Sequence, residues 1–513
     1  MLHKETVLIL DFGSQYTQLI ARRIREINVY SEIHPNNFPY EKIKELNPVG
    51  IILSGGPMSV YESDSLSVDV RIFDLGIPIL GVCYGIQLIT KIFGGKVEPA
   101  QNREYGKTSF KIVSDSLLFK DVNLSSTVWM SHGDIITDAP IKFNITGVTE
   151  DSPIASFENT EDNIYGLQFH PEVAHTIEGY KIISNFVFEI CKCTGSWNAQ
   201  NFIEESVDYI KRIVGNSQVI CALSGGVDST VAAILVNKAI GNQLTCIHVD
   251  TGLMRLNESE NFVAEFREQY KLNLISVNAE EEFLKKLTGI VDPEQKRKII
   301  GNTFIEIFER EANKLGIVDF LVQGTLYPDV IESVPVKGSS VTIKTHHNVG
   351  GLPEIMKLKL IEPFRELFKD EVRKIGVQLG IKEDFIYKHP FPGPGLAVRI
   401  IGEITKDKLD TLREADDVFI SELKQSGIYN SIWQAFAVFL PIQSVGVMGD
   451  NRTYENVIAL RAVTSTDGMT ADWYKFDYNI LDNISNKIIR KVKGVNRVVY
   501  DISSKPPSTI EWE

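Results

Sequence analysis

The sequence predicts an α/β protein in which two doubly wound parallel-sheet domains are followed by a small α+β domain. The first two domains are predicted because short apolar runs alternate with helical segments, and turns rich in Gly, Ser and Asp directly follow the runs. The third is predicted because short strands alternate with two longer helical segments, 405–424 and 478–492. We place the domains at residues 5–197, 198–388 and 389–513, with the first boundary at a polar turn.

Composition limits the class of protein. The chain has 513 residues, 43% hydrophobic and 23% charged, which is typical of a globular protein with an ample core. Its net charge of −14 argues against a general surface for nucleic acid or acidic membranes. The first apolar run is too short for a signal peptide, and no run has the length needed to cross a bilayer. We therefore expect a cytoplasmic protein with no nucleic-acid or membrane partner, and its five cysteines are too few for a disulfide framework.

Three apolar runs in the first domain, 7–10, 49–53 and 77–82, are predicted to be buried parallel strands. Each run ends in residues suited to ligand binding, and a helical segment follows the first and the third run. Because ligands of open α/β sheets lie beyond the carboxyl ends of the strands, we expect the site of this domain at that edge. The turns concerned are Asp11-Phe12-Gly13-Ser14, Ser54-Gly55-Gly56-Pro57 and Cys83-Tyr84-Gly85.

Cys83 is predicted to lie at a sharp turn from strand to helix. Such an elbow exposes the side chain above a helix N-terminus, which favours the reactive thiolate. A lone cysteine after an apolar strand is more often a buried core residue. The segment 166–172 favours the reactive interpretation, because it is a predicted strand that ends in His170 and has a carboxylate, Glu172, two residues later. A base held by a carboxylate is what a cysteine nucleophile needs.

These features resemble the class I glutamine amidotransferases, and the resemblance covers roughly residues 5 to 195. It implies that Cys83 attacks the side-chain amide of glutamine, that His170 carries the proton and that Glu172 orients His170. The oxyanion of the tetrahedral intermediate would be bound by backbone N–H groups at Gly56 and Tyr84. The resemblance also implies four glutamine-binding residues, Gln87, Ser131, His132 and Gly133, although a structural hydrogen bond is as good an explanation for His132.

The second domain has a predicted strand, 219–223, that leads into Ser224-Gly225-Gly226-Val227-Asp228-Ser229 and then an amphipathic helix, 230–239. A small turn that opens a helix leaves several backbone N–H groups without partners, so it can bind an anion such as phosphate. The carboxylate of Asp228 would repel phosphate on its own, which suggests that Mg²⁺ lies between them. A basic run, 296–298, is predicted before a helix that begins near Ile299, and by composition alone it would be a solvated surface.

The loop 224–229 resembles the pyrophosphate-binding loop of the ATP pyrophosphatase family, and the chain has no kinase-type P-loop sequence. The resemblance implies that the domain binds ATP with Mg²⁺ and that Asp228 is the metal ligand. It also implies that Arg297 or Lys298 binds phosphate. The implied ATP-binding residues are Ser224, Gly225, Gly226, Val227, Asp228, Ser229, Thr230 and Val249, the last at the end of a predicted strand.

Three motifs in the last third resemble signatures of the GMP synthetase family: 389–396, 445–452 and 504–513. With the two preceding domains in this order, the resemblance covers essentially the whole chain. It implies a ligase that uses ATP, xanthosine monophosphate (XMP), glutamine and water to make GMP, AMP, pyrophosphate and glutamate. Ammonia from the glutaminase site would attack an adenylated XMP intermediate. The implied XMP-binding residues are Gln434, Arg452, Lys505, Thr509 and Glu511, and the last domain would pair two subunits in a homodimer.

Transfer of ammonia requires shelter from water, and we expect the segments 292–298 and 338–351 to close over the site. The adjacent His346 and His347 are predicted to act in a loop rather than as metal ligands. Two other functions are considered: an ATP pyrophosphatase that acts on another acceptor, and a nucleotide-binding scaffold with an inactive amidotransferase domain. The motifs of the last third argue against the first, and the complete set of Cys83, His170 and Glu172 argues against the second.

Overall fold

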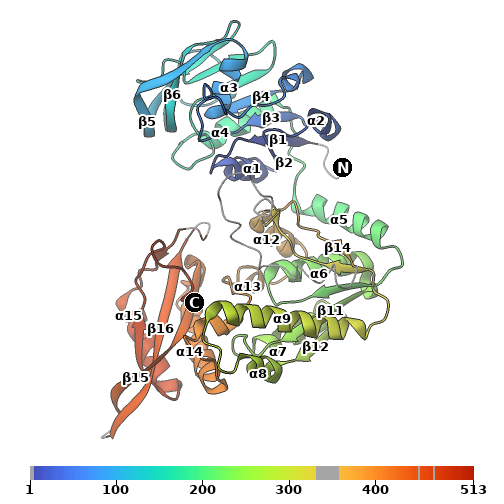
Figure 1. Cartoon of the computed structure of the whole chain (residues 1–513), viewed down its shortest axis with the longest axis vertical. Helices are drawn as coiled ribbons and strands as arrows, with labels where there is room; N and C mark the ends of the chain where they lie inside the picture. The colour runs from blue at the N-terminus through green and yellow to red at the C-terminus, as the bar shows by residue number, and fades with distance from the viewer. Residues whose placement is uncertain (1–4, 328, 331–357, 449–450, 466–467, 469) are drawn as a thin grey trace. The chain divides into compact units, whose positions relative to one another are not determined.

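The computed structural model describes residues 5–327, 329–330, 358–448, 451–465, 468 and 470–513 (Figure 1). These residues form two compact units, Met1–Phe202 and Ile203–Glu513. The predicted division of the second unit at residue 388 stays a prediction, because one hydrophobic core includes residues on both sides of it, from Ile220 to Val495. Within the described part of the chain, every helix falls short of the length or the apolar content that a membrane span requires.

The first unit is organised on a nine-stranded sheet with the order β2-β1-β3-β4-β9-β8-β7-β5-β6. The strands from β2 to β9 pair in parallel, and the remaining strands pair antiparallel. The parallel strands are β1 (Thr6–Asp11), β2 (Tyr30–Pro35), β3 (Gly50–Leu53), β4 (Ile79–Val82) and β9 (Ile164–Leu167). The others are β5 (Lys96–Ile112), β6 (Ser125–Asp138), β7 (Asn144–Val148) and β8 (Ser156–Asn159).

The predicted strands at 7–10, 49–53 and 77–82 are confirmed as β1, β3 and β4, which lie side by side in the sheet. Their residues are buried because both faces of a parallel sheet are covered, as their continuous apolar sequences require. The helices of the unit are α1 (Thr17–Glu26), α2 (Tyr40–Leu46), α3 (Tyr84–Ile92) and α4 (Gly179–Ser184). The neighbouring strands therefore bring the three predicted turns to one edge.

The second unit contains a five-stranded parallel sheet with the order β12-β11-β10-β13-β14. Its strands are β10 (Val219–Ala222), β11 (Leu244–Asp250), β12 (Leu274–Asn278), β13 (Phe320–Val322) and β14 (Lys359–Ile361). The associated helices are α5 (Ala199–Val214), α6 (Val227–Ile240), α7 (Glu258–Glu268), α8 (Glu280–Leu287), α9 (Pro293–Asn313), α12 (Lys369–Gln378) and α13 (Glu383–Ile386). The predicted α/β class is confirmed in both units.

Two details of the predicted helices are wrong. Helix α6 is not amphipathic, because its apolar residues are buried around the helix and its more accessible residues lie mainly near its two ends. Helix α9 begins at Pro293 rather than near Ile299. The side chain of Asp292 caps it by accepting a hydrogen bond from the backbone of Gln295 (2.8 Å), and proline at the first helical position has a φ suited to a helix. The basic run therefore lies inside the helix.

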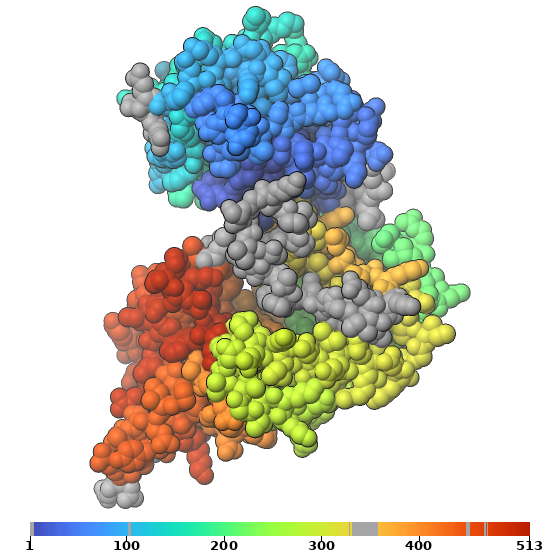
Figure 2. Space-filling view, in the orientation of Figure 1, coloured from blue at the N-terminus to red at the C-terminus, as the bar shows by residue number. Residues whose placement is uncertain are grey.

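The last part of the second unit is the predicted small α+β arrangement, with helices α14 (Lys406–Gln425) and α15 (Tyr478–Lys491). Its strands are β15 (Gln434–Met448), β16 (Asn451–Thr464), β17 (Asp472–Trp473) and β18 (Val495–Tyr500). Strands β15 and β16 pair antiparallel, and β18 pairs parallel with β16. The far end of the β15–β16 hairpin projects from the body of this unit as an arm (Figure 2).

Candidate active sites

Cys83 lies between β4 and α3 in a backbone conformation that residues with a side chain rarely adopt, with φ 54° and ψ −103°. The turn is tight because a Cβ atom on Gly85 would lie 2.3 Å from the carbonyl oxygen of Leu53. Position 85 must therefore be glycine if the helix is to pack this close to β3. The sharp turn from strand to helix that the sequence predicts is confirmed, and its strained residue is the cysteine.

His170 follows β9, which is the neighbour of β4 in the sheet. Its Nδ1 atom lies 2.7 Å from Oε1 of Glu172, and both side chains are almost completely buried. The backbone N–H of His170 donates to Trp129 (3.0 Å), and Thr176 donates its hydroxyl to the carbonyl of His170 (2.6 Å). Since the bond to Glu172 occupies Nδ1, Nε2 is the ring atom left for proton transfer.

The electrostatics of His170 favour its charged form. Burial by itself would lower the pKa of His170, but the negative charges of Glu172 and Cys83 and the hydrogen bonds to both side chains outweigh it. The pKa of His170 is therefore raised well above its ordinary value of 6.5. Cys83 also has a second contact, from Sγ to the carbonyl of Ser131 at 3.8 Å. The predicted trio of Cys83, His170 and Glu172 thus comes together in the fold.

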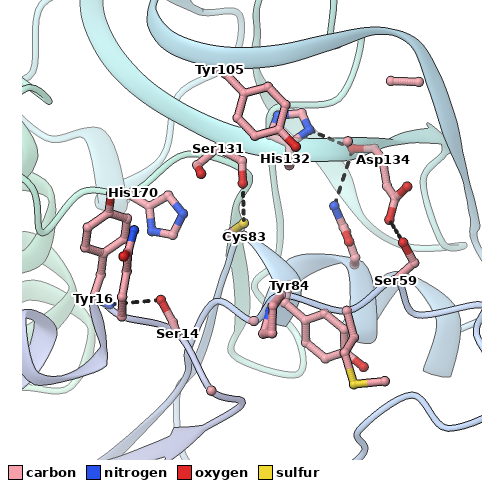
Figure 3. Close-up of a pocket in the computed structure, with 18 of the residues that line it drawn as sticks. Ser14, Tyr16, Ser59, Cys83, Tyr84, Tyr105, Ser131, His132, Asp134 and His170 are labelled. Carbon is pink, nitrogen blue, oxygen red and sulfur yellow. Dashed lines mark hydrogen bonds between the residues drawn. The ribbon is translucent and has the colours of Figure 1, made fainter. Parts of the chain in front are cut away.

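Cys83 and His170 face a cavity of about 600 Å³ at the carboxyl edge of the parallel strands (Figure 3). Glu172 does not line the cavity. The residues predicted for the oxyanion and for glutamine all line it with Cys83 and His170: Gly56, Tyr84, Gln87, Ser131, His132 and Gly133. The arrangement can hold a small polar substrate against a thiol that has a base beside it.

His132 is buried and makes two polar contacts. Its Nδ1 lies 2.7 Å from the carbonyl oxygen of Asp134, and its Nε2 lies 3.4 Å from Oε2 of Glu104. Burial raises the pKa of Glu104, but hydrogen bonds from His132, Ser152 and Thr149 outweigh it, so the pKa is lowered. The bonds of His132 agree with a structural role, and its place in the cavity lining agrees with a role in binding glutamine.

Asp134 also lines this cavity and directly follows the predicted Ser131, His132 and Gly133. Its two carboxylate oxygens accept hydrogen bonds from the hydroxyls of Ser59 and Tyr61, each at 2.6 Å. Its carbonyl accepts from Gln87 (3.4 Å) and is bonded to His132 (Figure 3). Asp134 therefore joins the loop that follows Gly56 to β6. Its position beside Ser131-His132-Gly133 is the sequence signal that points to it.

In the second unit, β10 leads through the predicted loop into α6. Gly225 has a φ of +75°, and the hydroxyl of Ser224 accepts a hydrogen bond from the backbone of Gly226 (3.3 Å). The hydroxyls of Ser224 and Ser229 lie 3.1 Å apart. This loop places backbone N–H groups and hydroxyls at the N-terminus of a helix, where an anion is stabilised. The remaining predicted ATP-binding residues are Val227, Asp228 and Thr230 on α6 and the buried Val249 on β11.

The residues around Asp228 fit a cation shared with a phosphate. Its Oδ1 atom is buried and has no hydrogen-bond partner among the described residues, while its Oδ2 atom lies 3.5 Å from Lys369. A buried carboxylate oxygen without a partner is costly unless something satisfies it. Hard oxygen ligands of this kind suit Mg²⁺, which usually takes only one or two protein carboxylates.

Four of the five predicted XMP-binding residues lie near one end of the last sheet. Glu511 accepts a bidentate pair of hydrogen bonds from the buried Arg399 (2.9 and 3.1 Å) and a third from Gln434 (2.8 Å). Thr509 donates its hydroxyl to the backbone carbonyl of Glu511. Lys505 donates to the carbonyl of Gly468 (2.8 Å). Arg399 is a further member of this cluster that the sequence does not indicate.

The structure does not bring Arg452 to this cluster. Gln434 pairs with Val463 at one end of the β15–β16 hairpin, and Arg452 pairs with Val447 near the other. Eleven residues of extended strand separate the two pairs, which corresponds to about 36 Å. Within one chain, Arg452 therefore lies too far away to share a ligand with Glu511.

Of the two segments predicted to close over the site, the structure describes only 292–298. The segment 338–351, with His346 and His347, lies outside the described residues, as do Gly449 and Asp450 of the motif 445–452. In the segment 292–298, Lys296 is fully buried and pairs with the side chain of Glu513.

Comparisons with known proteins match each part of the chain. Residues 8–190 match the family Glutamine amidotransferase class-I, residues 218–304 match the Phosphoadenosine phosphosulfate reductase domain, and residues 421–512 match the GMP synthase C terminal domain. Relatives from Brachyspira hyodysenteriae and Carboxydothermus hydrogenoformans are each 59% identical, over 99% of both chains. A relative from Aquifex aeolicus is 57% identical over 100% of both chains. All three carry the name GMP synthase (glutamine-hydrolyzing).

Proposed function

The chain belongs to the glutamine-hydrolysing GMP synthases, and from that premise we propose that it converts XMP to GMP with ATP and glutamine at two reaction centres. It is a ligase that forms a C–N bond and also has glutaminase activity. The assignment of residues rests on one observation: Cys83, at its sharp turn, lies beside the buried pair of His170 and Glu172. Nδ1 of His170 and Oε1 of Glu172 are 2.7 Å apart. We place the glutaminase centre there and the adenylating centre at the loop 224–229.

At the first centre, the thiolate of Cys83 attacks the side-chain amide carbon of glutamine. The C–N bond breaks, and Nε2 of His170 supplies the proton with which ammonia leaves. Water then attacks the thioester, His170 takes the proton of that water, and glutamate and the thiol are released. The backbone N–H groups of Gly56 and Tyr84 bind the oxyanion, a stabilisation of about 3 kcal/mol for each donor in acyl-transfer enzymes. Glutamine is held by Gln87, Ser131, His132 and Gly133.

At the second centre, the 2-oxygen of XMP attacks the α-phosphorus of ATP. The bond between that phosphorus and the bridging oxygen breaks, and pyrophosphate leaves into the loop 224–229. Ammonia then attacks C2 of the purine, and AMP departs with the oxygen, leaving GMP. Ammonia must arrive without taking up a proton, since ammonium is not a nucleophile.

ATP would be bound by the loop and by Thr230 and Val249. The support is the helix N-terminus and the hydroxyls that border it. We propose Mg²⁺ as the companion of ATP, with Asp228 as its protein ligand, because Oδ1 of this carboxylate is buried without a partner among the described residues. When bound, the cation would neutralise phosphate charge in the transition state.

XMP would contact Gln434, Lys505, Thr509 and Glu511. We propose that the protein is a cytoplasmic homodimer that associates through its last domain, residues 389–513, with residues 198–388 forming the adenylating domain. A second copy also supplies a role for Arg452, which lies about 36 Å along the hairpin from Gln434 of its own chain. In a dimer, this arginine could reach the XMP site of the other subunit.

The test is the formation of AMP and pyrophosphate in the presence of ATP, Mg²⁺ and ammonium, with and without XMP. We expect both products only with XMP. A Cys83→Ala variant should lose glutamine-dependent GMP synthesis and keep the ammonium-dependent reaction. Products formed equally well with another carbonyl acceptor, or loss of both reactions in this variant, would contradict the proposal.

A further inference from the structure

The loop 250–255 follows β11 and lies next to the pyrophosphate-binding loop. A Cβ atom on Gly225 would lie 3.3 Å from the terminal methyl of Met254, so the two loops are in direct contact. Residues at the carboxyl end of β11 are the ones expected to contact the nucleoside of ATP. The position of this loop therefore bears on how ATP sits.

Three successive backbone carbonyls of this loop are bound by residues from much later in the chain. The carbonyl of Gly252 accepts from Nη2 of Arg413, and that of Met254 accepts from Nε of the same side chain (3.3 Å). Between them, the carbonyl of Leu253 accepts from the backbone of Leu396 (2.8 Å). The loop thus has its carbonyls fixed from α14 and from the short helix at 395–399.

Arg255, the next residue, is also bound to the later part of the chain, through its side chain. Nε of Arg255 lies 3.0 Å from Oδ2 of Asp416 on α14, and its Nη2 donates to the carbonyl of Ala435 (3.2 Å). Asp416 also accepts from the backbone of Ala437 (2.9 Å), so it is itself fixed by β15. Every residue from 252 to 255 is therefore bonded to the part of the chain after residue 394.

The loop also packs closely against α8. Gly252 has a φ of +68°, and a Cβ atom there would lie 2.3 Å from Cγ of Glu280 on α8. The guanidinium of Arg413 is held in turn by Asp410 (2.6 Å) and lies 3.4 Å from Glu280. Its side chain is only 13% exposed. A planar guanidinium offers donors in several fixed directions, which the ammonium of lysine does not.

We propose that Arg413 is a positioning residue for the ATP site, which fixes the loop 250–255 against the pyrophosphate-binding loop from the small last domain. Arg413 touches neither the pyrophosphate loop nor the XMP cluster in any described contact. It acts through the carbonyls of Gly252 and Met254. The last domain, in this view, completes the site for ATP as well as that for XMP. The inference rests on the proposed adenylating function.

The experiment measures ammonium-dependent formation of pyrophosphate by the full-length protein, with KM for ATP and KM for XMP determined separately. Arg413→Met removes the donors and keeps much of the side-chain volume, and Arg413→Lys keeps the charge. Lys406→Ala is the matched control, because Lys406 lies on the same helix and pairs with Glu280 (2.9 Å) but does not contact the loop.

We expect KM for ATP to rise on the order of tenfold or more in Arg413→Met and by less in Arg413→Lys, with KM for XMP within about twofold of the unchanged protein. Lys406→Ala should leave both KM values unchanged. An unchanged KM for ATP in both Arg413 variants would overturn the inference. An equal rise of both KM values together with a lower unfolding temperature would also overturn it, since that pattern indicates a general structural role. Absence of XMP-dependent pyrophosphate in the unchanged protein would instead contradict the proposed function.

Discussion

The pair of His170 and Glu172 offers the sharpest quantitative test of the glutaminase centre. Glu172→Gln replaces a carboxylate, 2.7 Å from Nδ1, with a neutral group of nearly the same shape. Two unit charges about 4 Å apart attract by about 4 kcal/mol at an effective dielectric constant of about 20, and a hydrogen bond to a charged group is worth about 1.5–3 kcal/mol. The two values overlap rather than add, so we expect the imidazolium in the transition state to lose about 3–4 kcal/mol. This corresponds to a decrease in kcat of about 10²–10³.

The assay is glutamate release from glutamine, with ammonium-dependent GMP synthesis by the same preparation as the control for folding. We expect ammonium-dependent GMP synthesis to be unchanged in Glu172→Gln. KM for glutamine should change little, because Glu172 does not line the cavity. A kcat for glutamate release within about threefold of the unchanged protein would refute the assignment of Glu172. Equal losses of both activities would show that the variant is misfolded and that our account of Glu172 as a local partner is wrong.

The effect of Glu172→Gln on the unfolding free energy should also depend on pH. Burial opposes the charge on His170, but Glu172 and Cys83 prevail and its pKa is raised well above 6.5. A group whose pKa is higher in the folded state stabilises the fold fully below its unfolded pKa, and that contribution is lost as pH rises through the folded pKa. The difference in unfolding free energy between the unchanged protein and Glu172→Gln should therefore be largest near pH 6 and narrow at alkaline pH. A difference that widens with pH would contradict the sign.

Three further predictions concern single residues. Gly85→Ala should lower the unfolding free energy by about 1–3 kcal/mol and abolish glutamate release, because the new methyl would meet the carbonyl of Leu53; denaturant unfolding measures the first effect. Asp228→Asn should lower XMP-dependent pyrophosphate formation by about 100-fold, with partial recovery at higher Mg²⁺ concentration and unchanged glutamate release. Glu511→Gln should raise KM for XMP about tenfold or more, because it leaves the buried guanidinium of Arg399 without its charged partner; titration of XMP at saturating ATP measures this.

The sequence predicts the parallel strands and the turns after them for a physical reason. Apolar runs such as those of β1, β3 and β4 are typical of a parallel sheet covered on both faces, and a glycine lies within three residues of the end of each run. Cys83 and His170 become visible as site residues because each follows such a run directly. Their meeting at one edge follows from the pairing of β4 with β9, which the sequence does not specify.

Other parts of the sites depend on partners that carry no sequence pattern. Arg413 binds the carbonyls of Gly252 and Met254, about 160 residues earlier. Every residue has a carbonyl, so nothing in the sequence marks these two as acceptors. Arg399 is similar: its guanidinium is fully buried against Glu511, whereas its place in the sequence, three residues after the motif 389–396, does not mark it as a site residue. Such contacts depend on the tertiary fold alone.

The basic run 296–298 shows what the position of a helix boundary decides. If α9 is taken to begin near Ile299, nothing in the sequence places Lys296 in the core. Because α9 begins at Pro293, the run follows the helical period, and Lys296 falls on the face that also buries Ile300, Thr303 and Ile307.

Lys296 is accordingly fully buried. Its ammonium donates to the carbonyl of Ile400 (2.8 Å) and pairs with Glu513, although burial prevails and lowers its pKa. Lys298 lies two residues further along the helix, on the exposed side, and Arg297 is only partly buried. The prediction that Arg297 or Lys298 binds phosphate stays a prediction. Lys296 is unsuited to that role, because a fully buried ammonium that already has its acceptors cannot also reach a solvated triphosphate.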